Sequence, residues 1–194
     1  MLHGILMISE EYSPSHSTLT RVSVLAKHFA REGHRVVLLS NSGRLTKENA
    51  LSTLLGNLIS RRFDSEGVAW FFPPVLRTGS TRGPLKALEG LLAIGSTLVF
   101  GAILLTTCKS SIDVIYSSTA QVQGFIGSLL STALRKRLVA NFGDPAFARD
   151  TGLVRRFERV LEKITLSKSD HVFAVDPVIV EYVRSVNRLN GVGA

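Results

Sequence analysis

The chain has 194 residues, of which 45% are hydrophobic and 20% are charged. This balance excludes a disordered chain, and the length suffices for one good-sized domain but not for two large ones. The formal net charge is +8. This excess favours an anionic membrane surface or a phosphorylated ligand, unless it reflects only a solvated basic surface. Nucleic acid is disfavoured as a partner, because no recognition-helix, zinc-site or RNA-binding pattern is present in the sequence.

The first forty residues or so contain the best-defined pattern in the chain. Residues 4–9 are a short apolar run typical of a buried strand, and residues 10–17 form a polar loop. Residues 18–32 have helical spacing, Gly33 is a typical residue after a helix end, and residues 36–40 form a second buried strand. This is a βαβ unit with parallel strands. Ligands bind beyond the carboxyl ends of such strands, so residues 10–17 are placed at the candidate site.

The rest of the chain continues the alternation of strands and helices. Strands are predicted over residues 67–72, 112–116, 138–142 and 171–175, and helices over residues 120–134, over residues 151–167 and after Asp176-Pro177. Residues 44–63 are interpreted as a connection with a short helix. The pattern predicts an α/β, Rossmann-like, three-layer domain over residues 3–185, with a mostly parallel sheet of about six strands. Residues 186–194 resemble the start of a linker.

An uncharged stretch precedes the fourth predicted strand. No charged residue occurs between Leu91 and Cys108, which is close to the roughly 20 apolar residues that a transmembrane helix needs. Glycine and threonine residues dilute its hydrophobicity. We favour a helix over residues 85–108 that is largely packed against protein. A helix that also touches a bilayer surface and a true transmembrane span remain as alternatives.

Several polar residues fall in the predicted loop and helix start after the first strand. Ser15, His16 and Ser17 precede a helix N-terminus, where backbone N–H groups bind a phosphate or carboxylate. Histidine titrates near neutral pH, so His16 could donate or accept a proton, and Arg21 is placed to bind phosphate through its guanidinium. Alternatively, Ser17 is only the N-cap, His16 an exposed loop residue and Arg21 a solvated surface residue.

Two later strand ends add candidates at the same predicted edge. Ser117 and Ser118 follow the strand over residues 112–116, and Asp144 follows the strand over residues 138–142. Asp144 could orient or deprotonate an acceptor hydroxyl. The alternative is that the serines and Asp144 are ordinary turn residues, since serine and aspartate both favour turns. No cluster of His, Cys and Asp suggests a metal site.

Taken in order, these motifs resemble the N-terminal half of GT-B glycosyltransferases of family 4, whose members are retaining enzymes. The residues that carry the resemblance are Tyr12-Ser13-Pro14, Ser15-His16-Ser17, Gly33-His34-Arg35-Val36, Asp113-Val114-Ile115, Asp144-Pro145, Phe157-Glu158-Arg159 and Ser169-Asp170-His171. Arg21 matches an arginine of the branch that adds sugars to lipid-linked carriers.

The resemblance implies the acceptor-side domain of an enzyme that moves a sugar from a nucleotide-sugar donor to an acceptor hydroxyl, with a lipid-linked carrier as one candidate acceptor. It implies Asp144 and His16 as catalytic residues, and Ser15, Ser17, Arg21, Ser117 and Ser118 as acceptor or donor-phosphate ligands. The family uses no required metal or cofactor, and its donor-binding C-terminal half is missing here, so this domain alone is expected to be inactive. A cytoplasmic location is expected, and a peripheral position at the inner face of the membrane is one option. The alternative is a non-enzymatic α/β domain that binds a phosphorylated ligand or a protein partner.

Overall fold

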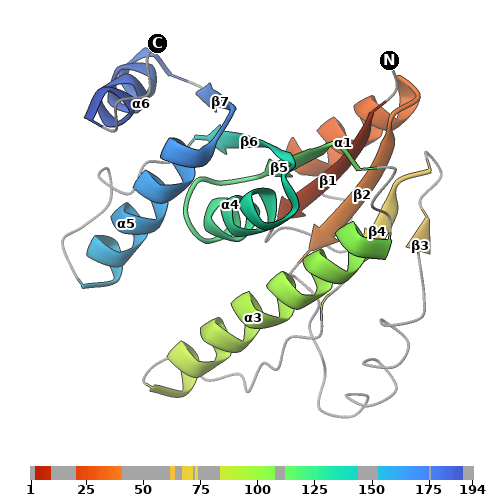
Figure 1. The fold of residues 1–194 in the computed structure, drawn as a ribbon, viewed down its shortest axis with the longest axis horizontal. Coiled ribbons are helices and arrows are strands. Elements are labelled where there is room, and N and C mark those ends of the chain that lie inside the picture. Colours follow the sequence, from red (N-terminus) through yellow and green to blue (C-terminus); the bar gives the residue numbers. More distant parts are fainter. Residues whose placement is uncertain are drawn as a thin grey trace. The chain divides into compact units, whose positions relative to one another are not determined.

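The computed structural model describes residues 3–9, 21–40, 62–63, 67–71, 73, 84–107, 112–143, 153–174 and 176–189. Within these ranges the chain has the predicted α/β, Rossmann-like architecture, with helices and strands alternating along the sequence (Figure 1). Its backbone contacts divide it into two compact units, Met1–Ile112 and Asp113–Ala194.

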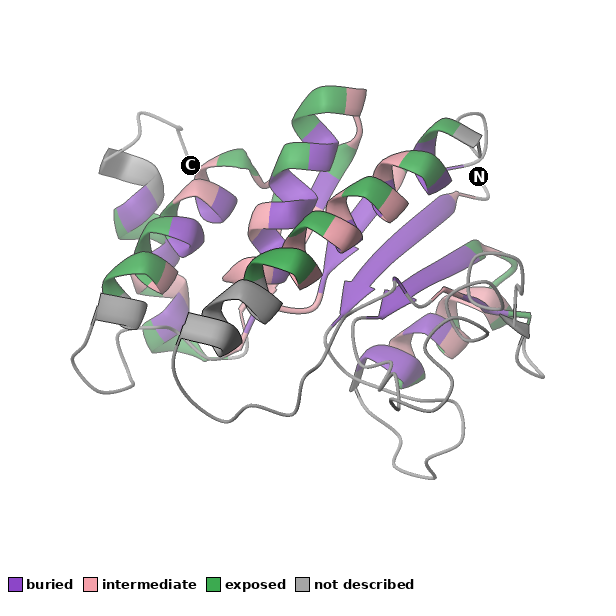
Figure 2. Cartoon of the chain, turned by 90° about the horizontal axis from the view of Figure 1, so that it is seen from below, coloured by how far each residue is buried: buried purple, intermediate pink, exposed green. Residues whose placement is uncertain are grey.

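The first unit contains the predicted βαβ motif. Strand β1 (Gly4–Ser9) pairs in parallel with β2 (Arg35–Ser40), and α1 (Arg21–Arg31) connects them and contacts β2. Every residue of β1 is buried, as is all of β2 after its first residue, which is why both strands are coloured as buried along their length in Figure 2. Apolar burial of this kind is the main favourable term in folding. The two strands therefore form the core of the unit.

The end of α1 follows the predicted capping pattern. Gly33 has a φ of 87°, a left-handed conformation that glycine adopts without a steric penalty, and its N–H donates to the carbonyl of Ala30 at 3.0 Å. His34 then accepts a hydrogen bond at Nδ1 from the backbone N–H of His3, at 3.1 Å. This bond holds the start of β2 beside the start of β1, so His34 has a structural partner.

Strand β3 (Arg62–Phe63) of the first unit was not predicted. The predicted strand β4 (Ala69–Phe71) extends the parallel sheet beyond β2, and β3 pairs with β4 in the antiparallel direction. The strand order of this unit is β3-β4-β2-β1. The sequence interpretation of residues 44–63 as a connection was wrong at its last two residues. A strand of two residues has no measurable periodicity, and it forms here because it pairs with backbone groups at the edge of β4.

Helix α3 (Pro84–Thr107) confirms the predicted helix, and in its described part most side chains are buried or half-buried. Over residues 91–106 one side of the helix is buried, whereas the opposite side is exposed and includes Leu91, Leu92, Val99 and Ile103. None of the helices in the described ranges is long and apolar enough to span a membrane.

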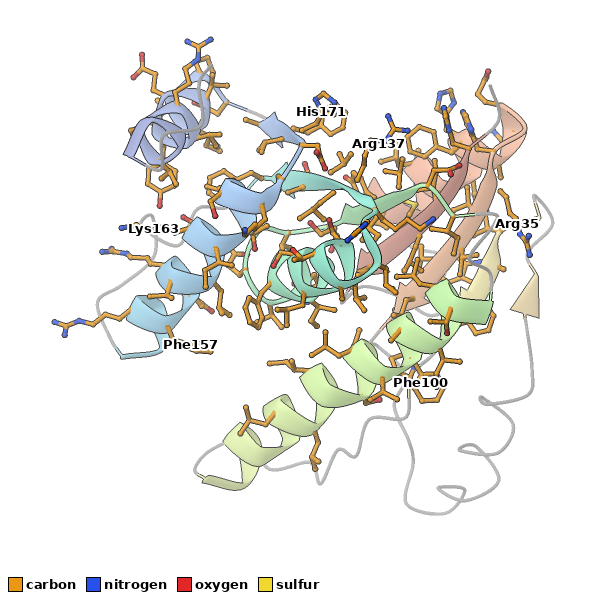
Figure 3. The ribbon with its side chains drawn as sticks, viewed as in Figure 1. Arg35, Phe100, Arg137, Phe157, Lys163 and His171 are labelled. Atoms are coloured by element: carbon orange, nitrogen blue, oxygen red, sulfur yellow. The ribbon has the colours of Figure 1, made fainter. Side chains whose placement is uncertain are left out.

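The second unit contains three parallel strands in the order β5-β6-β7. The strands β5 (Val114–Ser117), β6 (Arg137–Phe142) and β7 (His171–Ala174) are connected by α4 (Val122–Leu134) and α5 (Leu153–Lys168). Arg137 and His171 are exposed at the starts of β6 and β7 and lie at the same edge of this sheet (Figure 3). The carboxyl ends of β5 and β6 consequently share the opposite edge.

Helix α6 (Pro177–Leu189) follows β7 and closes the second unit. The Asp176 side chain caps it as predicted, because Oδ1 accepts the N–H of Val178 at 2.7 Å. Ile179, Val183 and Val186 pack into a core with Phe142 and Leu166. The helix thus extends four residues into the range where a linker was expected to begin, because Val186 completes its apolar face.

Candidate functional site

The carboxyl ends of β5 and β6 form the described part of the predicted site. Residues 118–121 connect β5 to α4 at this edge. The Asn141 side chain, near the end of β6, donates from Nδ2 to the carbonyl oxygen of Ser118 at 3.2 Å. This hydrogen bond ties the two strand ends together, so the turn after β5 has a fixed position relative to the end of β6.

Polar side chains gather where β5 leads into α4. We call them the polar cluster, which consists of Ser117, Ser118, Thr119, Gln121, Gln123 and Asn141. Thr119 donates from Oγ1 to Oε1 of Gln123 at 2.6 Å, and Gln123 is only 1% exposed. Nε2 of Gln123 and Oγ of Ser117 are buried and have no hydrogen-bond partner among the residues that the structure describes. A buried donor without a partner costs about 1–3 kcal/mol, so these two atoms are where a ligand group or an ordered water would add stability.

Two glycines explain why α4 lies so close to its neighbours. A Cβ added at Gly124 would lie 2.5 Å from Cγ2 of Thr165 on α5 and 2.8 Å from the carbonyl oxygen of Thr119. A Cβ added at Gly127 would lie 3.0 Å from a Leu138 methyl group and 3.8 Å from Cβ of Ser117. Glycine at both positions therefore lets α4 pack on α5 and on the strands at once. The same packing covers the Ser117 side chain.

A buried carboxylate on α5 supports the polar cluster. Glu162 is fully buried, and its Oε2 accepts a weak hydrogen bond from Nε2 of Gln121 at 3.4 Å. Tyr182 on α6 shares a second side-chain hydrogen bond with Glu162. Burial, and then this hydrogen bond, raises the pKa of the Tyr182 hydroxyl well above its usual range, so Tyr182 stays protonated at physiological pH. Gln121 is thereby held by Glu162 of α5, which is itself bonded to Tyr182 of α6.

The N-terminus of α4 adds backbone donors to the polar cluster. Gln121 is the N-cap residue and makes no side-chain capping bond, and the first turn of α4 contains no acidic residue. N–H groups in the first turn of a helix lack intrahelical partners and carry the positive end of the helix dipole. Together with hydroxyl and amide side chains they suit a ligand rich in hydroxyl groups or phosphate oxygens. The polar cluster itself contains no acid or base, so it is equipped to bind rather than to transfer protons.

The residues predicted from the sequence are described to different extents. Ser117 is fully buried and Ser118 is partly buried, and both lie at the end of β5 as expected. Arg21 begins α1, but its side chain is not described. Ser15, His16, Ser17 and Asp144 lie outside the described residues. The convergence of all seven residues therefore stays a prediction.

The sequence analysis missed the amide and threonine residues of the polar cluster, together with Glu162 and Tyr182. The only available signal was the Gln121-Val122-Gln123 pattern at the start of an otherwise apolar helix. In the described ranges no group of three His, Cys, Asp or Glu residues is placed to hold a metal ion.

Comparison with known proteins identifies the family. Residues 18–190 match the family model of the glycosyl transferase 4-like domain. The chain belongs to this family. The match covers most of the chain and confirms the resemblance to the N-terminal domain of GT-B glycosyltransferases. No curated protein matches the chain.

Two solved structures share the fold of this chain. The UDP-GlcNAc 2-epimerase from Methanocaldococcus jannaschii is 12% identical with a TM-score of 0.52, and the match covers 99% of this chain and 43% of the epimerase. UGT89C1 from Arabidopsis thaliana, in complex with UDP-L-rhamnose, is 16% identical with a TM-score of 0.54, over 95% of this chain and 49% of that protein. At these identities the likeness establishes the fold alone. The chain spans less than half the length of these proteins.

Proposed function

We propose that this glycosyl transferase 4-like domain is the acceptor-side half of a retaining glycosyltransferase. The complete enzyme would move a sugar from a nucleotide-sugar donor to an acceptor hydroxyl in the cleft between two Rossmann-like halves. The bond between the anomeric carbon and the donor phosphate would break, a bond from that carbon to the acceptor oxygen would form, and the hydroxyl proton would leave. A lipid-linked carrier at the cytoplasmic face of a membrane is the acceptor we favour.

The observation that carries this proposal is the family match over residues 18–190. The polar cluster supports it, because its hydroxyl, amide and backbone N–H groups suit a sugar or phosphate and lie at the carboxyl edge of parallel strands. Two solved structures of similar fold carry UDP or UDP-L-rhamnose. They support a nucleotide sugar as the donor.

Each candidate residue would have the role that its side-chain chemistry suits. The helix N-terminus at Ser15 and Ser17, with Arg21, would hold the negative charge of a diphosphate or a phosphorylated lipid. Ser118 and the buried amide of Gln123 would bind acceptor hydroxyl groups. Asp144 would orient the attacking hydroxyl and accept its proton, and His16 would hydrogen-bond sugar or phosphate. No metal or further cofactor is proposed.

The test is nucleotide release by a protein that joins this chain to the donor-binding half of the fold. With a panel of nucleotide sugars and polyprenyl phosphates, we expect Arg21→Ala and Asp144→Asn each to lower kcat/KM by at least about tenfold, since positioned charge and acid–base contacts contribute at least that much. The matched controls are Arg184→Ala, at an exposed position of α6, and Asp113→Asn, at the opposite end of β5, and both should keep the activity.

Three results would argue against the proposal. If Arg21→Ala and Asp144→Asn retain full activity and intact circular dichroism, neither residue belongs to the site. Transfer depends on fixing donor and acceptor together, so this chain alone should be inactive. If it releases nucleotide well above background, the second half is not required. Absence of release from every donor by the complete protein would favour a non-enzymatic binding domain.

A further inference from the structure

Helix α3 exposes an aliphatic stripe along one side. The stripe consists of Leu91, Leu92, Gly95, Val99, Ile103 and Thr106, which are the exposed residues in the part of α3 whose side chains are described. At 3.6 residues per turn these positions fall within about one third of the helix circumference. Leu91 and Val99 are 65% and 57% exposed. Figure 2 shows exposed residues recurring along α3, the helix whose first turns are grey.

A water-facing helix presents polar residues to the solvent, and the stripe does not. The buried side of α3 includes Leu104 and Leu105 as well as Thr97 and Gly101, and two leucines, a valine and an isoleucine are on the exposed side. No charged residue occurs between Leu91 and Thr107. A helix that is apolar all round is ordinarily buried on all sides. The stripe therefore needs an apolar partner.

The two threonines of α3 whose side chains are described do not require water. Thr106, the polar residue of the stripe, donates from Oγ1 to the carbonyl oxygen of Ala102 at 2.8 Å. Thr97 makes the same bond to Ala93 at 2.7 Å. A hydroxyl that bonds the preceding turn of its own helix is already satisfied when the helix enters an apolar medium. Covering the stripe with hydrocarbon would therefore leave no side-chain donor of the stripe without a hydrogen-bond partner.

The composition of the stripe favours lipid over protein. Protein interfaces are enriched in Tyr, Trp, Phe, Met and Arg, and the stripe contains none of these. Phe100, the aromatic residue of the described part of α3, is half-buried and lies off the stripe (Figure 3). In the sequence, Arg77, Arg82, Lys86 and Glu89 precede the uncharged stretch and Lys109 follows it, so the flanks have an excess of basic residues. Basic residues on both sides of an aliphatic segment complement an anionic bilayer surface.

We propose that the stripe docks α3 onto the surface of an anionic phospholipid bilayer, with the helix axis in the plane of the interface. The aliphatic side chains would enter the boundary between headgroups and acyl chains, and the excess of basic residues in the flanking sequence would favour anionic headgroups. This deepens the membrane-face part of the proposed function by naming the surface. The test measures binding and not sugar transfer, so either proposal can fail alone.

The experiment is vesicle flotation of the purified chain with mixed phosphatidylcholine and phosphatidylglycerol vesicles. We expect the wild-type chain to float with the vesicles, and Val99→Asp and Ile103→Asp each to lower its partition coefficient by at least about tenfold. Val160→Asp is the matched control, because Val160 is also a helical valine and is 54% exposed, on α5. Val160→Asp should float like the wild type. Part of the binding should persist in high salt, which screens phosphate contacts but not apolar ones.

A second measurement covers the case in which an aspartate variant fails to fold. Val99→Cys in a Cys108→Ser background carries a polarity-sensitive fluorophore, whose emission should shift to the blue when vesicles are added. The proposal is overturned if the wild type stays at the bottom of the gradient, if Val99→Asp floats as well as the wild type, or if the fluorophore does not respond. It is also overturned if light scattering shows a dimer that Val99→Asp converts to monomer, because the stripe would then be covered by a second copy of the chain.

Discussion

The closeness of α4 and α5 gives a sharp test of how the polar cluster is positioned. We expect Gly124→Ala to destabilise the chain, because the added Cβ would lie 2.5 Å from Cγ2 of Thr165 and 2.8 Å from the backbone oxygen of Thr119. Thr165 is fully buried and β-branched, and its Oγ1 donates to the carbonyl of Leu161 at 2.9 Å, so it has little room to move. Overpacking costs about 1–3 kcal/mol, and we take the upper end because one of the atoms is backbone.

The gain in helix propensity offsets part of this cost. Alanine is favoured over glycine within a helix by about 1 kcal/mol, which leaves a net loss of about 2 kcal/mol. For a chain of this size that lowers Tm by about 4–8 °C. Gly95→Ala on α3 is the matched control, because a Cβ there meets nothing within 4 Å. Gly95→Ala should gain about 0.5–1 kcal/mol from propensity alone.

Thermal unfolding followed by circular dichroism compares the two variants directly. Thr165→Ser removes the Cγ2 methyl and keeps the hydroxyl, so it should restore part of the stability of Gly124→Ala and show coupling in a double-mutant cycle. A Gly124→Ala variant with a Tm equal to or above that of wild type would refute the reasoning, and α4 would then not owe its position to this contact.

Two further predictions concern the buried polar groups. Ser117→Ala should raise the free energy of unfolding in urea by about 1 kcal/mol in the absence of ligand, because it removes a buried hydroxyl without a described partner; a loss of stability would show that the hydroxyl is bonded. Tyr182→Phe should reduce the loss of stability at alkaline pH. Burial and the Glu162 hydrogen bond raise the pKa of Tyr182, so its contribution is complete below about pH 10 and is lost as the pH rises further. Equal alkaline sensitivity of urea unfolding in both proteins would contradict this.

Local patterns in the sequence were enough to predict most elements and their ends. The buried run at residues 4–9, the glycine at position 33 and the Asp176-Pro177 pair each act through neighbours in the chain, by periodicity, backbone conformation or capping. Parallel pairing of β1 with β2 and of β5 with β6 followed from the connecting helices. The sequence also placed Ser117 and Ser118 at a strand end on the candidate edge.

What the sequence left open depends on contacts between distant segments. The antiparallel β3 exists only because β4 offers it an edge, and Ser117 is covered only because Gly127 lets α4 lie against it. Glutamine and glutamate at positions 123 and 162 are ordinary surface types, and they are buried here by helix packing between α4, α5 and α6. Likewise, the uncharged stretch of α3 has mainly apolar residues on both sides of the helix. Only its tertiary packing decides which side is buried and which forms the aliphatic stripe, because burial is a property of position in space and not of residue type.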